Sequence, residues 1–280
     1  MQTSAVRRPA VAGRFYPSKP EVLTRQLDQC LGAEATAPEK AESILGCMVP
    51  HAGYMYSGRV AGAVFHRLPA RSAYVILCPN HTGRGAPLSI MSKGEWLTPL
   101  GTVGIDSGLA ANLRQSCHLL MEDAKAHEDE HAIEVELPFL QRSVGSFRFV
   151  PIAIGVSRYA ALEALGHAMA QTLKVSASPV MIVASSDMNH YEPDDLTRVK
   201  DRKAIDQILA LNPAGLYEVV RNEDISMCGY GPAVAMLTAV KDLGATRAEL
   251  VQYATSADTS GDYSAVVGYA GIIISGSESA

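Results

Sequence analysis

Short apolar runs alternate along the chain with longer segments in which apolar residues recur at helical spacing. The first run, Ile44–Val49, is followed by Pro50, which cannot donate a hydrogen bond to a neighbouring strand and so marks a strand end. Gly53 and Gly58 then allow tight turns, and the apolar positions of residues 59–68 fit one face of a helix. This stretch therefore predicts a buried strand, a loop and a helix.

The same alternation continues to the end of the chain. We expect further strands over residues 74–79, 147–154, 179–184, 249–255 and 264–274, and helices over residues 20–31, 107–113, 159–173, 195–211, 214–221 and 233–243. Two shorter strands, 87–92 and 100–105, flank the single tryptophan, Trp96, and Pro138 interrupts an amphipathic segment over residues 133–140. Strands that alternate with helices are typical of βαβ units, so the pattern predicts a mostly parallel sheet.

Three of the predicted strands end beside a histidine. His51 and His81 each follow a strand that stops at a proline, and His190 follows a third strand with Asp187 three residues before it. Open α/β sheets bind their ligands beyond the carboxyl ends of the strands. Imidazole binds borderline transition metals and moves protons near neutral pH. The repetition, more than any single histidine, predicts a site at this edge of the sheet.

Cys228 lies in a loop just before the predicted helix 233–243, where the helix dipole would favour its thiolate. Two imidazoles and a thiolate would leave coordination positions open for water, O2 or a substrate, as a catalytic metal site requires. Two alternatives stay open at this point. Cys228 can be a buried, unreactive thiol, or it can be the nucleophile of a hydrolase with His190 as its base.

Residues 127–131 read His-Glu-Asp-Glu-His, which matches the HExxH motif of zinc metalloproteases. That motif needs a helix with both histidines on one face and a third ligand beyond it. In this chain the preceding residues are mostly polar, and Pro138 limits any helix that follows. We instead expect His131 to point toward the site and residues 128–130 to be largely solvated. Three further histidines are interpreted as structural or surface residues: His66, His118 and His167.

The composition is that of an ordinary globular protein, with 48% hydrophobic and 19% charged residues among 280. The net charge is −5 and the basic residues are scattered, so no nucleic-acid partner is expected. The first 30 residues lack the apolar core of a signal peptide, and no apolar stretch is long enough to span a membrane. We therefore expect a cytoplasmic protein that does not bind membranes, with its five cysteines reduced.

Several motifs stand out when they are taken together. They are Pro-His-Ala-Gly-Tyr at 50–54, Pro-Asn-His-Thr-Gly at 79–83, the segment 130–140, Ser-Ser-Asp-Met-Asn-His-Tyr at 185–191 and Cys-Gly-Tyr-Gly-Pro at 228–232. This set resembles the motifs of the MEMO family, the family of protein B of the AmmeMemoRadiSam system. Matches at 11–17 and 266–269 extend the resemblance to nearly the full length, which implies one domain over residues 1–280. The family is similar to the class III extradiol dioxygenases, which implies a single-domain α/β sandwich.

The resemblance also implies roles for individual residues. His51 and His81 would be the two histidine ligands of a non-haem iron, and Cys228 stands where the dioxygenases carry a glutamate ligand. His190 would match their acid/base histidine outside the metal's coordination sphere. Two further catalytic candidates would line the same pocket: Asp187 and His131. Because a thiolate favours softer ions than a carboxylate does, copper and zinc stand beside Fe2+ as candidate metals.

The function implied is that of a metal-dependent, dioxygenase-like oxidoreductase acting on an unknown small substrate. The alternative is a non-catalytic protein that binds a metal or a partner peptide in the same pocket. Prokaryotic members of the family are associated with a radical SAM enzyme and an AMMECR1-like protein, so the resemblance also implies a functional association with these two.

Overall fold

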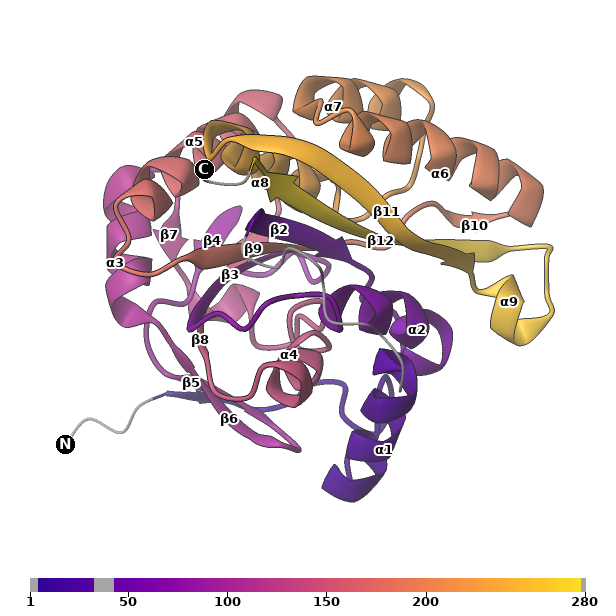
Figure 1. Ribbon diagram of the computed structural model, residues 1–280, viewed down its shortest axis with the longest axis horizontal. Coiled ribbons are helices and arrows are strands. Elements are labelled where there is room, and N and C mark those ends of the chain that lie inside the picture. The colour runs from indigo at the N-terminus through magenta and orange to yellow at the C-terminus, as the bar shows by residue number, and fades with distance from the viewer. Residues whose placement is uncertain (1–4, 33–42, 278–280) are drawn as a thin grey trace.

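A mixed sheet of twelve strands runs through the middle of the molecule, with helices against both of its faces (Figure 1). The computed structural model describes residues 5–32 and 43–277. The strands are β1 (Val6–Arg7), β2 (Ile44–Val49), β3 (Ala73–Pro79), β4 (Leu88–Ile90), β5 (Glu95–Thr98), β6 (Gly101–Ile105), β7 (Met121–Glu122), β8 (Arg148–Ile154), β9 (Val180–Ser185), β10 (His190–Glu192), β11 (Ala245–Thr255) and β12 (Val266–Gly276).

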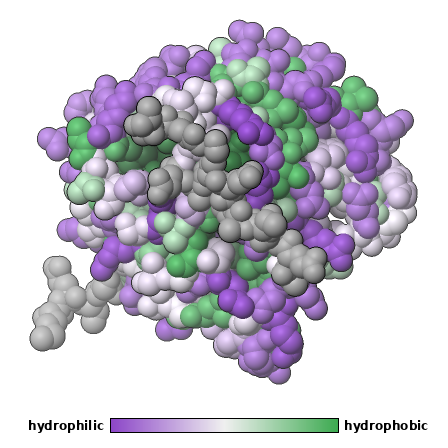
Figure 2. All heavy atoms as spheres, viewed as in Figure 1, coloured by the Kyte–Doolittle hydropathy of each residue, from purple (hydrophilic) through white to green (hydrophobic). Residues whose placement is uncertain are grey.

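The helices are α1 (Pro20–Leu31), α2 (Tyr54–Phe65), α3 (Ser107–Ser116), α4 (Leu137–Ser143), α5 (Tyr159–Lys174), α6 (Asp194–Leu209), α7 (Pro213–Asn222), α8 (Tyr230–Asp242) and the short α9 (Ala257–Ser260). A 3-10 turn spans Ala124–Ala126. Figure 2 shows the outward side of α1 as largely hydrophilic, and its buried residues are Leu23 and Leu27. Within the described ranges, no helix combines the length and the hydrophobicity needed to cross a membrane.

The five strands at the centre of the sheet, in the order β6-β8-β3-β9-β2, all run parallel to one another. Beyond β2 the sheet continues antiparallel with β12, which pairs in turn with β10 and β11. The predicted fold class, an α/β sandwich with a mostly parallel central sheet, is confirmed. Parallel strands covered by helices on both faces read as continuous apolar runs, which is why the sequence pattern identified them.

The core is divided by the sheet into two layers, and β3 shows how one strand serves both. Val75 and Leu77 belong to the layer formed with α3, α5, α6, α7 and α8. Tyr74, Ile76 and Cys78 belong to the layer formed with α1, α2 and α4. Successive side chains of a strand point to opposite faces, so every residue in the middle of this strand is buried.

Helix α2 begins five residues earlier than predicted, because Gly58 lies inside the helix instead of in a turn. The backbone N–H of Tyr54 donates to the carbonyl of Phe15 at 2.8 Å, which satisfies one of the free donors at the helix start. A Cβ atom on Gly62 would lie 2.1 Å from the carbonyl oxygen of Cys30 in α1. The glycines of α2 therefore serve the close approach of α1.

Two other expectations about element boundaries were wrong. Pro138 does not interrupt a helix but occupies the first turn of α4, where a proline has no hydrogen bond to lose. Trp96 lies within β5 and not between two strands, because the hairpin is formed by β5 and β6. Gly101, with a φ of 117°, permits the tight connection between these strands. The short elements β1, β7, β10 and α9 carried no periodic signal and were not predicted.

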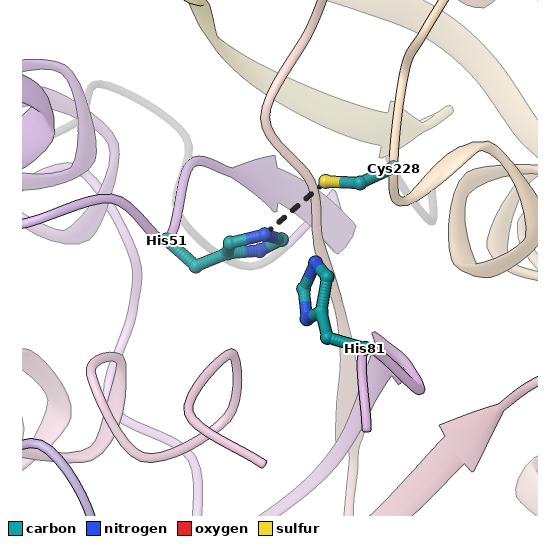
Figure 3. Close-up of side chains that lie close together, drawn as sticks. All are labelled: His51, His81 and Cys228. Atoms are coloured by element: carbon teal, nitrogen blue, oxygen red, sulfur yellow. Dashed lines mark hydrogen bonds between the residues drawn. The ribbon is translucent and has the colours of Figure 1, made fainter. Parts of the chain in front are cut away.

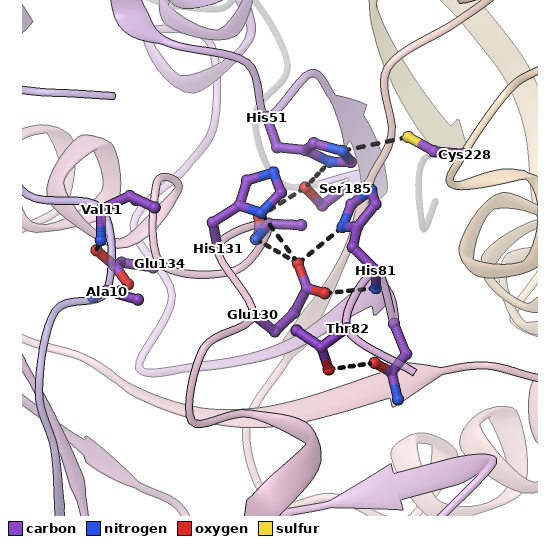
Figure 4. A network of polar contacts seen from close by, with 12 residues as sticks. Ala10, Val11, His51, His81, Thr82, Glu130, His131, Glu134, Ser185 and Cys228 are labelled. Carbon is purple, nitrogen blue, oxygen red and sulfur yellow. Dashed lines mark hydrogen bonds and ion pairs between the residues drawn. The ribbon is translucent and has the colours of Figure 1, made fainter. Parts of the chain in front are cut away.

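An N-terminal strap, residues 7–18, is tied to the body of the protein by one buried ion pair. The guanidinium of Arg7 contacts the carboxylate of Glu134, and both side chains are almost completely buried. Glu134 also accepts hydrogen bonds from the N–H groups of Ala10 and Val11, at 2.8 and 3.0 Å (Figure 4), and from the hydroxyl of Tyr16, at 2.7 Å. Both oxygens of this carboxylate thus hold the strap in place.

Replacing Arg7 by methionine would leave the Glu134 carboxylate buried without its cation. We expect the Arg7→Met variant to lose about 3–5 kcal/mol of unfolding free energy, measured by urea denaturation followed by circular dichroism. The matched control is Arg202→Met, which removes an exposed ion pair with Asp206 on α6. That change should cost less than about 0.5 kcal/mol, and equal losses in the two variants would contradict a structural role for the buried pair.

Candidate metal centre

The candidate site lies where three neighbouring parallel strands end. In the sheet, β9 lies between β3 and β2, so the residues that follow these strands reach the same edge. His51 follows β2, His81 follows β3, and Ser185 is the last residue of β9. Cys228 comes from the loop before α8 and faces the two imidazoles, as Figure 3 shows. The three residues predicted as metal ligands are therefore brought together.

The donor atoms of His51, His81 and Cys228 lie within 4.8 Å of one another. The Nε2 atom of His51 is 3.2 Å from the Sγ atom of Cys228. In a tetrahedral site with ordinary metal–nitrogen and metal–sulfur bonds, a nitrogen and a sulfur ligand are about 3.6 Å apart. Small side-chain movements would bring these three residues to that geometry, so the donor set fits a transition metal with at least one position left open.

Each imidazole is held by a hydrogen bond to its other nitrogen. The Nδ1 atom of His51 lies 2.9 Å from the hydroxyl oxygen of Ser185, and the Nδ1 atom of His81 lies 2.9 Å from a carboxylate oxygen of Glu130 (Figure 4). Metal-binding histidines almost always have such a partner, which fixes the ring orientation and leaves the opposite nitrogen for the metal. In both residues Nε2 is the nitrogen left available.

Glu130 is not solvated as predicted but completely buried. Its carboxylate also accepts hydrogen bonds from the N–H groups of His81, at 2.6 Å, and Ala132, at 3.0 Å. Burial by itself would raise the pKa of Glu130, but the hydrogen bond and charge of His81 outweigh it and lower the pKa. The prediction of solvated side chains is correct for the two preceding acids, Glu128 and Asp129, which are exposed and paired with Arg84.

His131 lies beside the two proposed ligands, as predicted. Its ring centroid is 4.7 Å from that of His81 and 5.4 Å from that of His51. Burial lowers the pKa of His131. The ring of His131 contacts that of Phe15 in the N-terminal strap, with 4.9 Å between the centroids. Together with His81 and Glu130, His131 forms a second group of donor atoms that lie within 4.8 Å of one another.

The HExxH segment does not form a metalloprotease site. Residues 127–131 follow the 3-10 turn and are not helical, so the two histidines do not share a helix face. The ring of His127 is buried 5.9 Å from that of Trp96, whose other contacts include the guanidinium of Arg7. Only His131 of this pair reaches the candidate site.

Asp187 and His190 lie beside the same site. Asp187 accepts a hydrogen bond from the backbone N–H of His51 at 2.8 Å, and burial raises the pKa of its carboxyl to about 7. The Nδ1 atom of His190 lies 3.0 Å from the carbonyl oxygen of Ser226, which can only accept. His190 therefore carries its proton on Nδ1 and presents Nε2 as a base, and burial lowers its pKa.

Cys228 differs from expectation in its ionisation. Burial raises the pKa of its thiol well above the ordinary value, and the charge of Asp187 raises it further. The N–H of Gly229, at the start of α8, acts in the opposite direction but does not outweigh these two effects. The imidazole that contacts the sulfur is that of His51 and not that of His190. The hydrolase alternative, with His190 as base, therefore has no such contact in the described part of the chain.

Sequence reasoning missed the side chains that support the ligands, which are Glu130, Ser185 and Glu136. The hydroxyl of Ser185 contacts the carboxyl of Glu136 at 3.0 Å, behind His51. A signal was nevertheless available, because acids at positions 130, 134 and 136 are interleaved with apolar residues. Charged residues are almost never fully buried unless they are paired, so acids in an apolar segment indicate polar partners in the core.

The fold has a counterpart among solved structures. An uncharacterized protein from Escherichia coli K12 superimposes with a TM-score of 0.55, covering 81% of this chain and 99% of that chain. The sequence identity is only 14%, so this similarity concerns the fold alone.

Sequence comparisons cover nearly the whole chain. A MEMO1 family protein from Methanopyrus kandleri is 44% identical over 277 residues, which are 95% of this chain and 98% of the relative. Another, from Methanosarcina barkeri, is 46% identical over 271 residues, which are 96% of this chain and 100% of the relative. The family model described as Memo-like protein matches residues 7–273. The chain therefore belongs to the Memo-like, or MEMO1, family.

Proposed function

We propose that this protein binds a single transition-metal ion between His51, His81 and Cys228 and is a metal-dependent oxidoreductase acting on a small substrate. One observation carries the proposal. Both imidazoles are fixed through Nδ1 by buried partners, which leaves Nε2 of each ring for a metal, and the donor atoms of His51, His81 and Cys228 lie within 4.8 Å of one another. Such an arrangement of ligands and supporting hydrogen bonds is what metal sites in proteins require.

Iron is the metal we propose, with copper and zinc as the alternatives that a thiolate ligand would favour. A bound iron ion would supply redox chemistry and open coordination positions for a substrate. Binding would displace the proton of the Cys228 thiol, because only the thiolate is a ligand. The released proton would pass to the solvent.

The remaining side chains would handle the substrate and its protons. His190 would act as an acid or base through Nε2, and the carboxyl of Asp187 has a pKa raised to about 7. The ring of His131 stacks on that of His81 and would line the substrate pocket. A cavity of about 440 Å³ is lined by residues of the N-terminal strap and of the start of α2, and by none of the proposed ligands. It is lined in part by Phe15, whose ring contacts His131, and by Tyr56. We propose that a small substrate enters here.

Cys228 also supports a second candidate function. Class III dioxygenases, which the sequence resembles, have a carboxylate at this position, and a thiolate would hold a soft ion more firmly. A non-catalytic protein that stores or senses a metal, or captures a partner peptide, would use the same residues.

In either case we propose a cytoplasmic protein that works with a radical SAM enzyme and an AMMECR1-like protein. All five cysteines are unpaired, as a reducing compartment would keep them.

For the metal site, the first prediction concerns metal content after anaerobic purification and reconstitution with Fe2+, or in parallel with copper or zinc. The unmodified protein should contain close to one ion per chain, and His51→Ala and Cys228→Ser should each contain less than about a tenth of that, because a ligand is missing. Elemental analysis by mass spectrometry measures this. His167→Ala is the matched control, since His167 is exposed and pairs with Asp242. The metal proposal fails if the unmodified protein binds no iron, copper or zinc.

The second prediction concerns Glu130, which holds His81 without belonging to the proposed ligand set. Glu130→Gln removes the charge that orients the imidazole, so the metal dissociation constant should rise about 10- to 100-fold. Competition with a chromogenic chelator measures the constant. Glu128→Gln alters an exposed neighbour and should leave it unchanged. Equal effects of the two substitutions would mean that general charge, and not the hydrogen bond to His81, controls affinity.

The third prediction separates catalysis from binding. If the site is an oxidoreductase, iron-loaded protein should consume O2 in the presence of a catechol and a reductant. His190→Ala should lower that rate about 100-fold while the bound iron stays unchanged, because a proton-transfer group is lost. An oxygen electrode measures the rate. Full iron occupancy without O2 consumption across a panel of substrates would favour the non-catalytic function.

A further inference from the structure

The hydroxyl of Ser185 contacts three polar groups in the core. Its oxygen lies 2.7 Å from the carbonyl oxygen of Ala132, 2.9 Å from Nδ1 of His51 and 3.0 Å from a carboxyl oxygen of Glu136. Ser185 and Glu136 are fully buried and His51 almost so. A hydroxyl can donate one hydrogen bond and accept two, so the direction of each contact can be worked out.

The carbonyl of Ala132 can only accept, and it makes the shortest of the three contacts. Ser185 must therefore donate its single proton to Ala132, because otherwise two acceptor oxygens would face each other at 2.7 Å. The other two groups must then both donate to the serine oxygen. His51 can do so through an Nδ1–H bond. Glu136 can do so only as a protonated carboxylic acid.

The surroundings of Glu136 agree with this assignment. No Lys or Arg side chain forms an ion pair with it in the described ranges, and its second oxygen has no hydrogen-bond partner there. The charged group that acts on it most is Asp187, which disfavours a second negative charge. Burial raises the pKa of Glu136 well above the ordinary value of a carboxyl group. A carboxylate here would be an unpaired buried charge, whereas a neutral acid loses much less on burial.

Glu134 provides a contrast two residues earlier. It is equally buried, but Arg7 and two backbone N–H groups face it, so its environment suits the charged form. The same short segment therefore supplies two different chemical species. Glu134 acts as an anion that holds the N-terminal strap, whereas Glu136 faces neutral or acidic groups.

We propose that Glu136 keeps its proton at neutral pH and, through Ser185, fixes His51 in the Nδ1–H tautomer, so that the Nε2 lone pair always faces Cys228. Glu136 is thus a positioning residue for the site. The inference deepens the proposed function, since it concerns how one proposed ligand is oriented. The tautomer and the protonation of Glu136 can nevertheless be measured in protein that holds no metal.

The test uses metal-free, isotopically labelled full-length protein at neutral pH. Carbon-13 NMR of the Glu136 side chain should report a carboxylic acid, and long-range 1H–15N correlation should report His51 with its proton on Nδ1. The His51 signals are assigned by their loss in His51→Gln. Infrared difference spectra between the unmodified protein and Glu136→Gln should show one carboxylic-acid C=O band lost, whereas Glu128→Gln, an exposed control, should remove none.

Ser185→Ala breaks the link while leaving both ends in place. The Nε2–H tautomer of His51 should then become populated, and the metal dissociation constant should rise about 10- to 100-fold. An ionised Glu136 in the unmodified protein, an Nε2–H tautomer of His51, or an unchanged tautomer in Ser185→Ala would each overturn the proposal. If the tautomer and the acid are found as stated but no metal binds, the proposed function fails and this inference stands.

Discussion

Three buried glutamate side chains on one short segment determine how the site is built. A carboxylate is costly to bury unless it finds a cation or several donors, and positions 130, 134 and 136 meet this constraint in three ways. Glu130 faces the imidazole of His81 and two N–H groups. Glu134 faces a guanidinium, and Glu136 faces a hydroxyl. Each solution ties a different part of the chain to the segment between the 3-10 turn and α4.

The sheet supplies the other half of the arrangement. Because β3, β9 and β2 are neighbours and parallel, their ends deliver His81, Ser185 and His51 to one edge without any special loop. The segment 130–136 then holds each ring by its Nδ1 atom, directly or through the serine. Backbone topology thus sets which residues meet, while the buried acids set how their rings are oriented.

Much of this could be predicted from the sequence, and the reasons are physical. Strands buried on both faces and helices with one apolar face leave strong periodic signals, and a proline followed by a histidine marks where a strand stops. Glu130 was misplaced because an acid that follows two other acids looks solvated, and only the apolar residues interleaved with the acids at 130, 134 and 136 indicate that the chain turns inward after Asp129. The start of α2 was missed for a similar reason, since its first donor is satisfied by Phe15, which is distant in sequence. Contacts between remote segments leave little trace in a local pattern.

The N-terminal strap has a consequence for how the protein matures. Its ion pair joins residues 127 positions apart, and the contact between Cys228 and His51 spans 177 positions. A nascent chain that has exposed only its first half on the ribosome would hold two histidines without their thiol partner. The ring contact between Phe15 and His131 likewise forms only after the segment around Glu134 has been synthesised. The candidate site is therefore completed late in biogenesis, after almost the entire polypeptide has been synthesised.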